Sequence, residues 1–388
     1  MKATGIVVEY NPFHNGHKYH LKNAKLSSDV TIAVMSGDFV QRGEPSIIDR
    51  WTKAKIALEN GVDIVVELPA FYSSQSAEIF AKGAIGILNE LKCTNLLFGS
   101  ESADLEELQR IATLQESTEF KLRLKIHLKN GNSYPTAHSL AMNEILKETA
   151  LNSNDILGLE YLKAIKYWNS TITPKVLKRE KIGYHDENII ENFASASKIR
   201  NCIKNNEDIN KLIPNETSKF LKNYNSFTFI EMFYPYLRYE FIKNSKNLSS
   251  IQDMEIGFEN RLYENALKYT NYQEFYSSII NKRYTLGRTQ RVLIHSLLNL
   301  TKDITEQVKQ EIPYVKIMGF SPKGREYLTY LKKFNNKKII TSYKNINQIF
   351  SDKVCKLIEF NENCSHIYRF INPYENYKIP IIKGGNNE

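Results

Sequence analysis

The chain has 388 residues, of which 42% are hydrophobic and 24% are charged, a composition typical of a packed globular protein and not of a disordered or fibrous one. No apolar run approaches the ~18 residues that a membrane span needs, and the first residues do not read as a signal peptide, so we expect a cytoplasmic protein without membrane contact. Lysine plus arginine outnumber aspartate plus glutamate by 52 to 43, a net charge of +9, which fits an anionic partner such as RNA but also occurs in lysine-rich compositions.

The first hundred residues alternate short β-branched runs with helical stretches. The runs cover residues 4–10, 29–35, 62–68 and 94–100, and the helical stretches lie near 17–28, 49–60 and 75–91. Runs this apolar are typical of strands that are buried on both faces. Strand, helix and strand at this spacing predict right-handed crossovers and a doubly wound parallel sheet, with the ligand site beyond the carboxyl ends of the strands.

The rest of the chain divides into three further patterns. Helical periodicity from about 103 to 169 is followed by a strand at 174–180 and a helix start at 195–200. An Asn-rich and Lys-rich stretch then precedes aromatic-rich helices, and the tail reads as one more strand, helix and strand. A chain of this length is expected to form more than one domain. We predict an α/β domain over residues 1–204, a helical domain over 205–305 and a small C-terminal α/β region over 306–388.

Between the first strand and its helix lies Asn-Pro-Phe-His-Asn-Gly-His, residues 11–17. Pro12 stiffens the turn and Gly16 allows close backbone approach, while His17 falls in the first helical turn, where N–H groups and the helix dipole attract phosphate. Two imidazoles, His14 and His17, add directional donors to such a site. The alternative is that both histidines only form the turn and cap the helix, but H-x-G-H at the first strand–helix junction favours a phosphate site.

This pattern resembles the HxGH nucleotidyltransferase superfamily, in which the two histidines contact a triphosphate and adenylyl transfer expels pyrophosphate. A second element of the superfamily is a serine-rich helix start ending in Ile-Arg, and Ser-Ala-Ser-Lys-Ile-Arg matches it with Ser195, Ser197 and Arg200. The threonine usual in that element is absent, so Arg200 is the firmer match. Both serines also suit plain N-capping, which needs no ligand.

A closer resemblance is to the bacterial tRNA(Met) cytidine acetate ligases. Those enzymes activate acetate with ATP to acetyl-adenylate and pyrophosphate, then transfer the acetyl group to N4 of the wobble cytidine of elongator tRNA(Met), giving N4-acetylcytidine without acetyl-CoA. The resemblance therefore implies ATP with Mg2+, acetate and tRNA as ligands. The matching segments are GIVVEYNPFHNGHKYHL, SGDFVQRGEPSIIDRWTKAKIAL, VELP, SAEIFAKGA, LLFGSE, NDILGLEYLKAI, SASKIR and KRYTLGRTQR.

The same resemblance implies the site residues. His14, His17 and Arg200 would be catalytic. Asn154 and Arg179 match positions that bind ATP in the family, although Arg179 also reads as a solvated charge. The implied ATP-binding set is Val7, Val8, Glu9, Tyr10, Asn11, Pro12, Phe13, His14, Asn15, Gly16, His17, His20, Gly99, Asn154, Arg179, Ser195, Ser197 and Arg200, of which His20 could equally be a surface residue.

The loop after the second strand, SGDFVQRGEP, carries more polar groups than a connection needs. Arg42 could orient the acetate carboxylate toward the α-phosphorus; alternatively, the loop folds over the ATP or is held by internal ion pairs. A small apolar pocket near Phe71, Tyr72 and Phe80 could exclude larger acids, although such aromatics are more often core. The residues expected to face the acetate are Ser36, Gly37, Asp38, Gln41 and Arg42.

The sequence offers no metal motif and no obvious nucleophile. A mixed anhydride with AMP is already activated, so acetyl transfer needs no covalent enzyme intermediate. Mg2+ is expected with ATP, but its protein ligands cannot be named from the sequence. The four cysteines form no C-x-x-C pair that would indicate zinc or redox chemistry; they are Cys93, Cys202, Cys355 and Cys364.

The segment NKRYTLGRTQR, residues 281–291, mixes cations with Tyr284, as an RNA-binding platform would. A charged helix face gives the same pattern. The basic tail at 323–338 is a weaker candidate. The tRNA-binding residues predicted from this segment are Lys282, Arg283, Arg288 and Arg291.

Two other functions remain open from the sequence. One is a nucleotidyltransferase that adenylylates a phosphorylated small metabolite; such enzymes are usually little longer than one α/β domain, so the extra length favours a macromolecular substrate. The other is an RNA-binding protein with a regulatory or vestigial nucleotide site, which the intact His14, Gly16, His17 and Arg200 disfavour. The sequence does not predict the oligomeric state.

Overall fold

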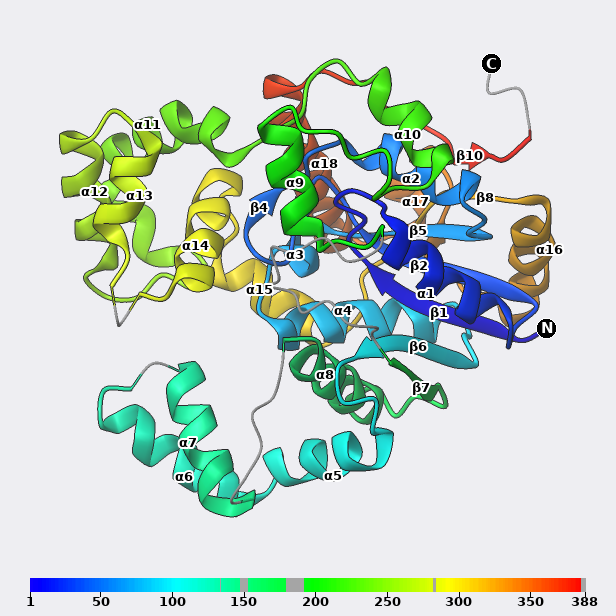
Figure 1. Cartoon of the computed structure of the whole chain (residues 1–388), viewed down its shortest axis with the longest axis horizontal. Helices are drawn as coiled ribbons and strands as arrows, with labels where there is room; N and C mark the ends of the chain where they lie inside the picture. The colour runs from blue at the N-terminus through cyan, green and yellow to red at the C-terminus, as the bar shows by residue number, and fades with distance from the viewer. Residues whose placement is uncertain (133, 147–152, 179–191, 282–283, 385–388) are drawn as a thin grey trace.

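The structure, a computed structural model, describes residues 1–132, 134–146, 153–178, 192–281 and 284–384 (Figure 1). A mostly parallel sheet runs through its centre in the order β10-β8-β5-β2-β1-β6-β7, with β9 beside β8. The five strands from the first part of the chain coincide with those predicted, which confirms the doubly wound parallel sheet. They are β1 (Ala3–Val8), β2 (Val30–Ser36), β5 (Ile64–Leu68), β6 (Asn95–Ser100) and β7 (Thr173–Lys178).

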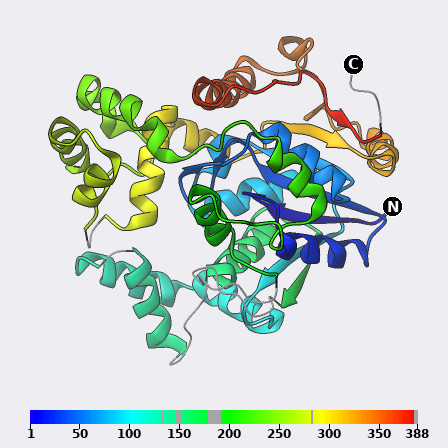
Figure 2. The same ribbon diagram turned by 45° about the horizontal axis from the view of Figure 1, so that its top comes forward.

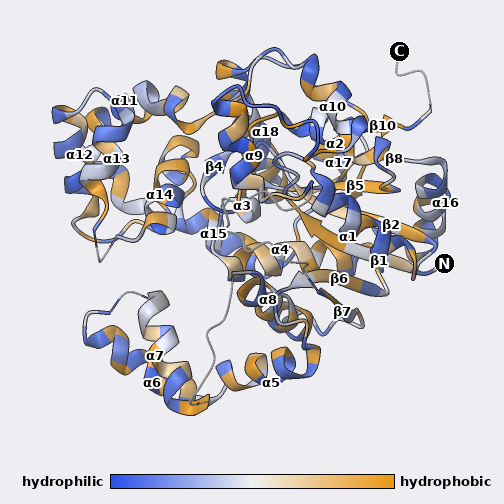
Figure 3. Cartoon of the chain, in the orientation of Figure 1, coloured by the Kyte–Doolittle hydropathy of each residue, from blue (hydrophilic) through white to orange (hydrophobic). Residues whose placement is uncertain are grey.

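Alternate side chains of the strands enter cores on opposite faces of the sheet. On β2, Ile32 and Val34 belong to one core, whereas Ala33 and Met35 belong to the other. Figure 3 shows hydrophobic residues gathered in these strands. Because both faces of each strand are apolar, helices must cover the sheet on both sides. The first core is covered by α4 (Ala77–Glu90) and α8 (Ser153–Tyr167), and the second by α1 (Asn15–Lys25) and α2 (Arg50–Glu59).

A helical hairpin follows β6 and stands off the body of the molecule (Figure 1). Its two helices are joined by their own contacts: the rings of Phe120 and His138 lie 5.2 Å apart, and Arg123 pairs with Glu144 at 2.8 Å. We refer to this hairpin of α6 and α7 as the arm; its buried residues Phe120, Ala141 and Met142 belong to the first core. The helices of this part are α5 (Leu105–Gln115), α6 (Thr118–Lys129) and α7 (Tyr134–Leu146).

The region after β7 is helical, and its middle part, residues 234–293, has a core of its own, in which Phe241, Leu262, Phe275 and Val292 are buried. Neither these helices nor any others in the described ranges are long and apolar enough to cross a membrane. The boundaries at 204 and 305 stay predictions. The elements are α9 (Ala196–Lys204), α10 (Asn215–Lys222), η1 (Ile230–Phe233), α11 (Tyr234–Lys243), η2 (Ser245–Ser250), α12 (Phe258–Lys268), α13 (Tyr272–Ile279), α14 (Leu286–Leu298) and α15 (Lys302–Lys309).

The last part of the chain extends the central sheet. The predicted strand, helix and strand are present, and β8 pairs antiparallel with β5 while β9 and β10 lie parallel to β8. The sequence did not indicate this pairing. It has a physical reason, because β5 would otherwise be an apolar edge strand open to other chains. The elements are β8 (Val315–Phe320), α16 (Pro322–Leu331), η3 (Lys332–Phe334), β9 (Ile339–Ile340), α17 (Ile346–Ile349), α18 (Asp352–Ile371) and β10 (Ile381–Ile382).

Candidate active site

The loop between β1 and α1 brings His14 and His17 together at the start of α1. His14 is the N-cap residue, and its Nδ1 accepts the N–H of Gly16 at 3.1 Å, while Nδ1 of His17 accepts the N–H of His14 at 3.3 Å. The two rings stack with their centroids 3.7 Å apart. Because both Nδ1 atoms accept, each neutral ring carries its proton on Nε2. Capping uses only the Nδ1 edge of each ring and so does not exclude phosphate binding through Nε2.

Buried aromatic rings support this loop on the side that faces the core. Tyr10 and Phe13 are both in the core, and the ring of Tyr10 lies 5.0 Å from that of His17. Asn11 ties the loop to the next segment, since its Oδ1 accepts the N–H of Ile47 at 2.8 Å. The pair of histidines is therefore fixed before any ligand binds. Of the predicted set, Val7 and Val8 lie within β1, Asn15 and Gly16 in the first turn of α1, and Glu9 and Pro12 in the loop.

The start of α9 lies beside the histidine loop, as the two superfamily elements required. Ser195 is the N-cap of α9: its Oγ accepts the N–H three residues on at 3.1 Å and lies 3.0 Å from Oγ of Ser197. The guanidinium of Arg200 donates to the carbonyl of Asn11 at 3.1 Å and pairs with Glu44 at 3.2 Å. Residues far apart in sequence thus present an arginine and a helix N-terminus to the histidine pair.

The end of β6 forms another side of the site. His20 donates from Nε2 to the carbonyl of Leu97 at 3.1 Å, so it ties α1 to β6. Gly99 lies in the same strand, and the side chain of Asn154, at the start of α8, donates to Glu101 just beyond it. Gly99 and Asn154 are thereby brought close together, and His20 has a structural contact.

The loop after β2 forms a small hairpin of β3 (Phe39–Val40) and β4 (Glu44–Pro45). Its Asp38 is buried, and its two carboxylate oxygens accept the N–H of Arg50 and the hydroxyl of Tyr374, both at 2.8 Å. Burial raises the pKa of Asp38. Asp38 is therefore held by contacts within the chain, one of the alternatives that the sequence left open. A carboxylate bonded in this way is a poor candidate for direct contact with acetate.

The tip of this hairpin packs against α14. Gly43 takes a φ of 77°, and a Cβ at this position would lie 2.4 Å from the backbone nitrogen of Arg291, so only glycine fits. Gln41 donates its backbone N–H to Oε1 of Glu9 at 2.8 Å. Arg42, between them, is partly exposed. The hairpin thus joins the β1 loop to the helical region.

Sequence reasoning missed Lys53, which ties the carboxyl ends of β1 and β2. The side chain is fully buried, and Nζ donates to the carbonyls of Glu9, Ser36 and Gly37 at 3.2, 2.8 and 2.6 Å. Burial lowers the pKa of Lys53 to about 8. The available signal was its place on α2 one turn before Ala57, on the apolar side of the helix. Ser36 and Gly37 are thus engaged through their backbone.

A buried network of charges lies next to this lysine. The guanidinium of Arg50 pairs with Glu67 and Glu362 at 2.8 Å each, and Lys316 pairs with the same two carboxylates at 3.1 and 2.9 Å. Burial alone would raise the pKa of Glu362, but Lys316 and Arg50 hold it well below its usual range. The network attaches β8 and α18 to the floor of the site, which the sequence could not reveal because Lys316 and Glu362 lie hundreds of residues from Arg50 and Glu67.

The aromatic residues considered for an acetate pocket are core residues, the alternative that the sequence left open. Phe71, Tyr72 and Phe80 are each at most 2% exposed and belong to the core between α4 and the sheet. The hydroxyl of Tyr72 donates to the carbonyl of Val308 at 2.7 Å. These rings fill space between elements.

The predicted RNA-binding arginines are held by acidic neighbours. Arg291 pairs with Asp253 at 3.0 Å, and Arg288 pairs with Glu255 and donates to the carbonyl of Asp253 at 3.2 Å. Tyr284 stacks on Phe258 and is largely buried. The other predicted residues Arg179, Lys282 and Arg283 lie outside the described residues.

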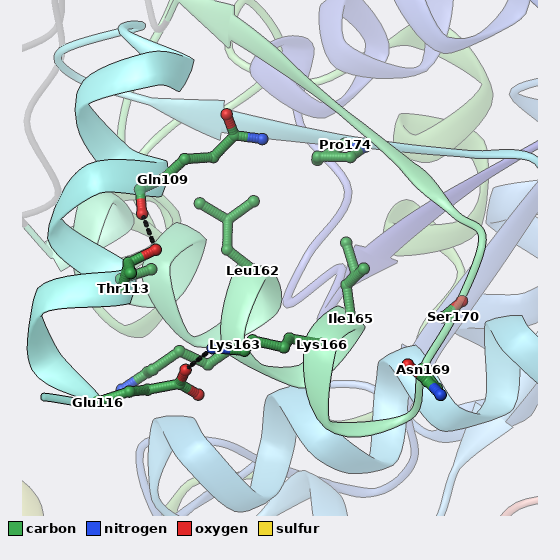
Figure 4. A pocket seen from close by; sticks show the side chains of 11 residues that line it. Gln109, Thr113, Glu116, Leu162, Lys163, Ile165, Lys166, Asn169, Ser170 and Pro174 are labelled. Atoms are coloured by element: carbon green, nitrogen blue, oxygen red, sulfur yellow. Dashed lines mark hydrogen bonds and ion pairs between the residues drawn. The ribbon is translucent and has the colours of Figure 1, made fainter.

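A pocket of about 400 Å³ lies elsewhere, between α5, α8 and β7 (Figure 4). None of the predicted site residues lines it, and its lysines Lys163 and Lys166 pair with Glu160 and Glu116. Within the described part of the chain, no group of three His, Cys, Asp or Glu side chains could hold a metal ion. The histidine loop therefore stays the best-defined site.

The structure combines a parallel sheet, stacked histidines at the start of the first helix and an arginine from a later helix, and this combination defines a nucleotidyltransferase-type site. The chain belongs to the HIGH Nucleotidyl Transferase family, whose model matches residues 1–379. The chain is 50% identical to the tRNA(Met) cytidine acetate ligase of Fusobacterium nucleatum over 98% of both chains, and 41% identical to that of Thermosipho africanus over 91% of this chain and 87% of the relative. It superposes on Thermotoga maritima TmcAL with a TM-score of 0.92 (apo, 32% identity) and 0.89 (bound with alpha-thio ATP, 33% identity), each covering 98% of this chain and 99% of the other.

Proposed function

We propose that this chain is an ATP-dependent ligase that converts acetate to acetyl-adenylate and transfers the acetyl group to N4 of the wobble cytidine of elongator tRNA(Met). Support comes from the similarity over almost the full length to the tRNA(Met) cytidine acetate ligases of Fusobacterium nucleatum and Thermosipho africanus. The observation in the structure that carries the proposal is the stacked pair of His14 and His17 at the start of α1.

The first step adenylates acetate. A carboxylate oxygen of acetate attacks the α-phosphorus of ATP, and the bond to the β-phosphate oxygen breaks to release pyrophosphate. Negative charge accumulates on the phosphate oxygens, where the Nε2–H donors of His14 and His17 and the N–H groups at the start of α1 would stabilise it. Arg200 would hold the leaving phosphates with the directional donors of its guanidinium.

The second step transfers the acetyl group. The exocyclic N4 of cytidine attacks the carbonyl carbon of acetyl-adenylate, AMP leaves, and the nitrogen loses a proton. The anhydride supplies the activation, so the chain needs only to position the two reactants and exclude water. Acetyl-CoA takes no part in this scheme.

The remaining site residues divide by their contacts. Gly99, near the end of β6, and Asn154, at the start of α8, would bind the nucleotide together with Arg179. Tyr10 and Phe13 support the histidine loop from the core. Among the residues assigned to acetate, Arg42 is the cation that would orient the carboxylate. Asp38 and Gln41 contribute by shaping the loop, because their polar atoms bond to neighbouring segments.

Mg2+ is expected to enter with ATP. The described residues hold no group of three metal-ligating side chains, so they do not fit a resident metal ion. Mg2+ commonly keeps its waters and binds mainly through substrate phosphates, and no step above depends on a protein-held metal.

The tRNA would approach the carboxyl edge of the sheet, where the helical region lies. Lys282, Arg283, Arg288 and Arg291 stay candidates for contact with it, but Arg288 and Arg291 would have to exchange acidic partners for phosphate. A tRNA substrate also places the reaction in the cytoplasm.

Acetate-dependent exchange of labelled pyrophosphate into ATP tests the first step in isolation. The purified chain should catalyse exchange with acetate and not with acetyl-CoA. Exchange that instead requires a phosphorylated metabolite would contradict the proposal and favour adenylyl transfer to a small molecule.

A further inference from the structure

Three lysines line one exposed face of α6. Lys121, Lys125 and Lys129 are each four residues apart, so they lie on the same side of the helix and rise by about 6 Å from one to the next. All three are exposed, and none of them pairs with an acidic side chain within the described ranges. We refer to these residues as the lysine face of α6.

The acidic residues of the arm gather on the other flank of α6. Glu119 and Glu144 both pair with Arg123, at 2.9 and 2.8 Å, and Glu144 also contacts His127 at 3.0 Å. The cations of that flank are therefore neutralised within the hairpin, whereas the charge of the lysine face is not. Such a separation leaves one side of the arm strongly positive.

The arm also lies where a large substrate of this site would pass. Strand β1 begins beside the N-terminus, and in both views the α6–α7 hairpin and helices α11–α14 lie on the opposite side of the molecule (Figures 1 and 2). That is the side toward which β1 and β2 point their carboxyl ends. Helix α5 leaves the sheet from the same edge, directly after β6.

We propose that the lysine face of α6 binds the phosphate backbone of the tRNA, a surface separate from the segment at 281–291. This assignment rests on the proposed function. Rows of lysine at regular spacing suit the sequence-independent contacts to phosphates that position a nucleic acid. The contrast with Arg288 and Arg291 favours α6, since binding there displaces no internal ion pair.

RNA is a better occupant of this face than a second copy of the chain. The net charge of +9 opposes the meeting of two lysine faces. Leu122 and Ile126 beside the lysines are 60% and 50% exposed, and they offer apolar contact to sugars and bases while the lysines hold phosphates.

The test compares two triple variants of the full chain. K121Q/K125Q/K129Q removes the lysine face, and K2Q/K22Q/K92Q removes the same charge from exposed positions just before β1, in the last turn of α1 and just before β6, at the amino-terminal edge of the sheet on the far side of the molecule (Figure 1). Binding of tRNA is measured against salt concentration, together with acetate-dependent pyrophosphate exchange. We expect the α6 variant to bind tRNA about 10- to 100-fold more weakly, with a salt dependence reduced by about two to three ions, and to exchange pyrophosphate as the wild type does.

Several results would overturn the assignment. Unchanged tRNA affinity in the α6 variant would do so, as would an equal loss in the K2Q/K22Q/K92Q control, which would indicate a general effect of charge. A wild-type dimer that the α6 variant disrupts without weaker tRNA binding would indicate a protein interface instead. Failure of the wild type to acetylate tRNA would count against the proposed function itself.

Discussion

The carboxyl edge of β1 and β2 and the arm of α6 and α7 differ in how much of their polar chemistry is satisfied inside the chain. At the carboxyl edge of the sheet, Lys53 donates to three carbonyls, and His14 and His17 together cap the start of α1. On the arm, the lysine face of α6 has no acidic partner among the described residues. The proposed nucleotide site is therefore built before binding, whereas the proposed RNA surface would depend on summed charge. Single substitutions should have large effects in the first region and small effects in the second.

Replacement of His17 by alanine should have the largest effect. Removing one donor to the developing phosphate charge should lower acetate-dependent pyrophosphate exchange by about 10²- to 10³-fold, with folding retained. His366→Ala is the control, because that ring is exposed on α18 and belongs to no predicted site. A steady-state exchange assay that found equal losses for the two variants would show that the loss is not specific to the histidine pair.

Replacement of Lys53 by methionine should destabilise the fold by about 3 kcal/mol, since three buried carbonyls lose their donor. Denaturant unfolding measures the change, with Lys22→Met on the exposed side of α1 as the control. A loss below about 1 kcal/mol would show that the edge does not depend on this lysine.

The same lysine predicts a pH dependence. Burial lowers its pKa to about 8 in the folded chain, whereas an unfolded lysine titrates near 10.4. Between these values the unfolded state binds the extra proton, so stability from this group rises with pH. The wild type should gain stability relative to Lys53→Met from pH 8 to pH 10, and a narrowing difference would contradict the assignment.

Replacement of Arg291 by glutamine should have the smallest effect. The guanidinium is already paired with Asp253, so the variant should lose about 1 kcal/mol of stability and bind tRNA no more than about threefold more weakly. Filter binding at fixed salt gives the affinity. A loss as large as that expected for the lysine face of α6 would mean that α14 is the main RNA surface.

The sequence predicted best what is local in the chain. The four strands of the central sheet and the three long helices of the first hundred residues follow from their own apolar periods, and the histidine loop lies within one short segment. The pairing of β8 with β5 joins residues that are far apart, and no local pattern encodes it. Asp38 looked like a substrate group because its partner Tyr374 comes from the end of the chain.

Buried charges were missed for the same reason. No role was predicted for Arg50 and Lys53, because the carbonyls and carboxylates that satisfy them are supplied by other strands and by α18. The RNA-binding prediction relied on the number of cations in a segment. The structure adds what a count cannot give, which is the acidic partner beside each arginine of α14.

The central claim is that the chain carries out both steps of one ligase reaction, with the histidine pair acting in the first step, on which the second depends. Mass spectrometry of nucleosides from tRNA incubated with the chain, ATP, Mg2+ and labelled acetate tests it most directly, with His14→Ala and His17→Ala in parallel. The account predicts labelled N4-acetylcytidine at the wobble position with the wild type, reduced by at least about 10²-fold in each variant. Labelled cytidine made equally well by the variants, or AMP transferred to a small metabolite with no labelled nucleoside, would contradict it.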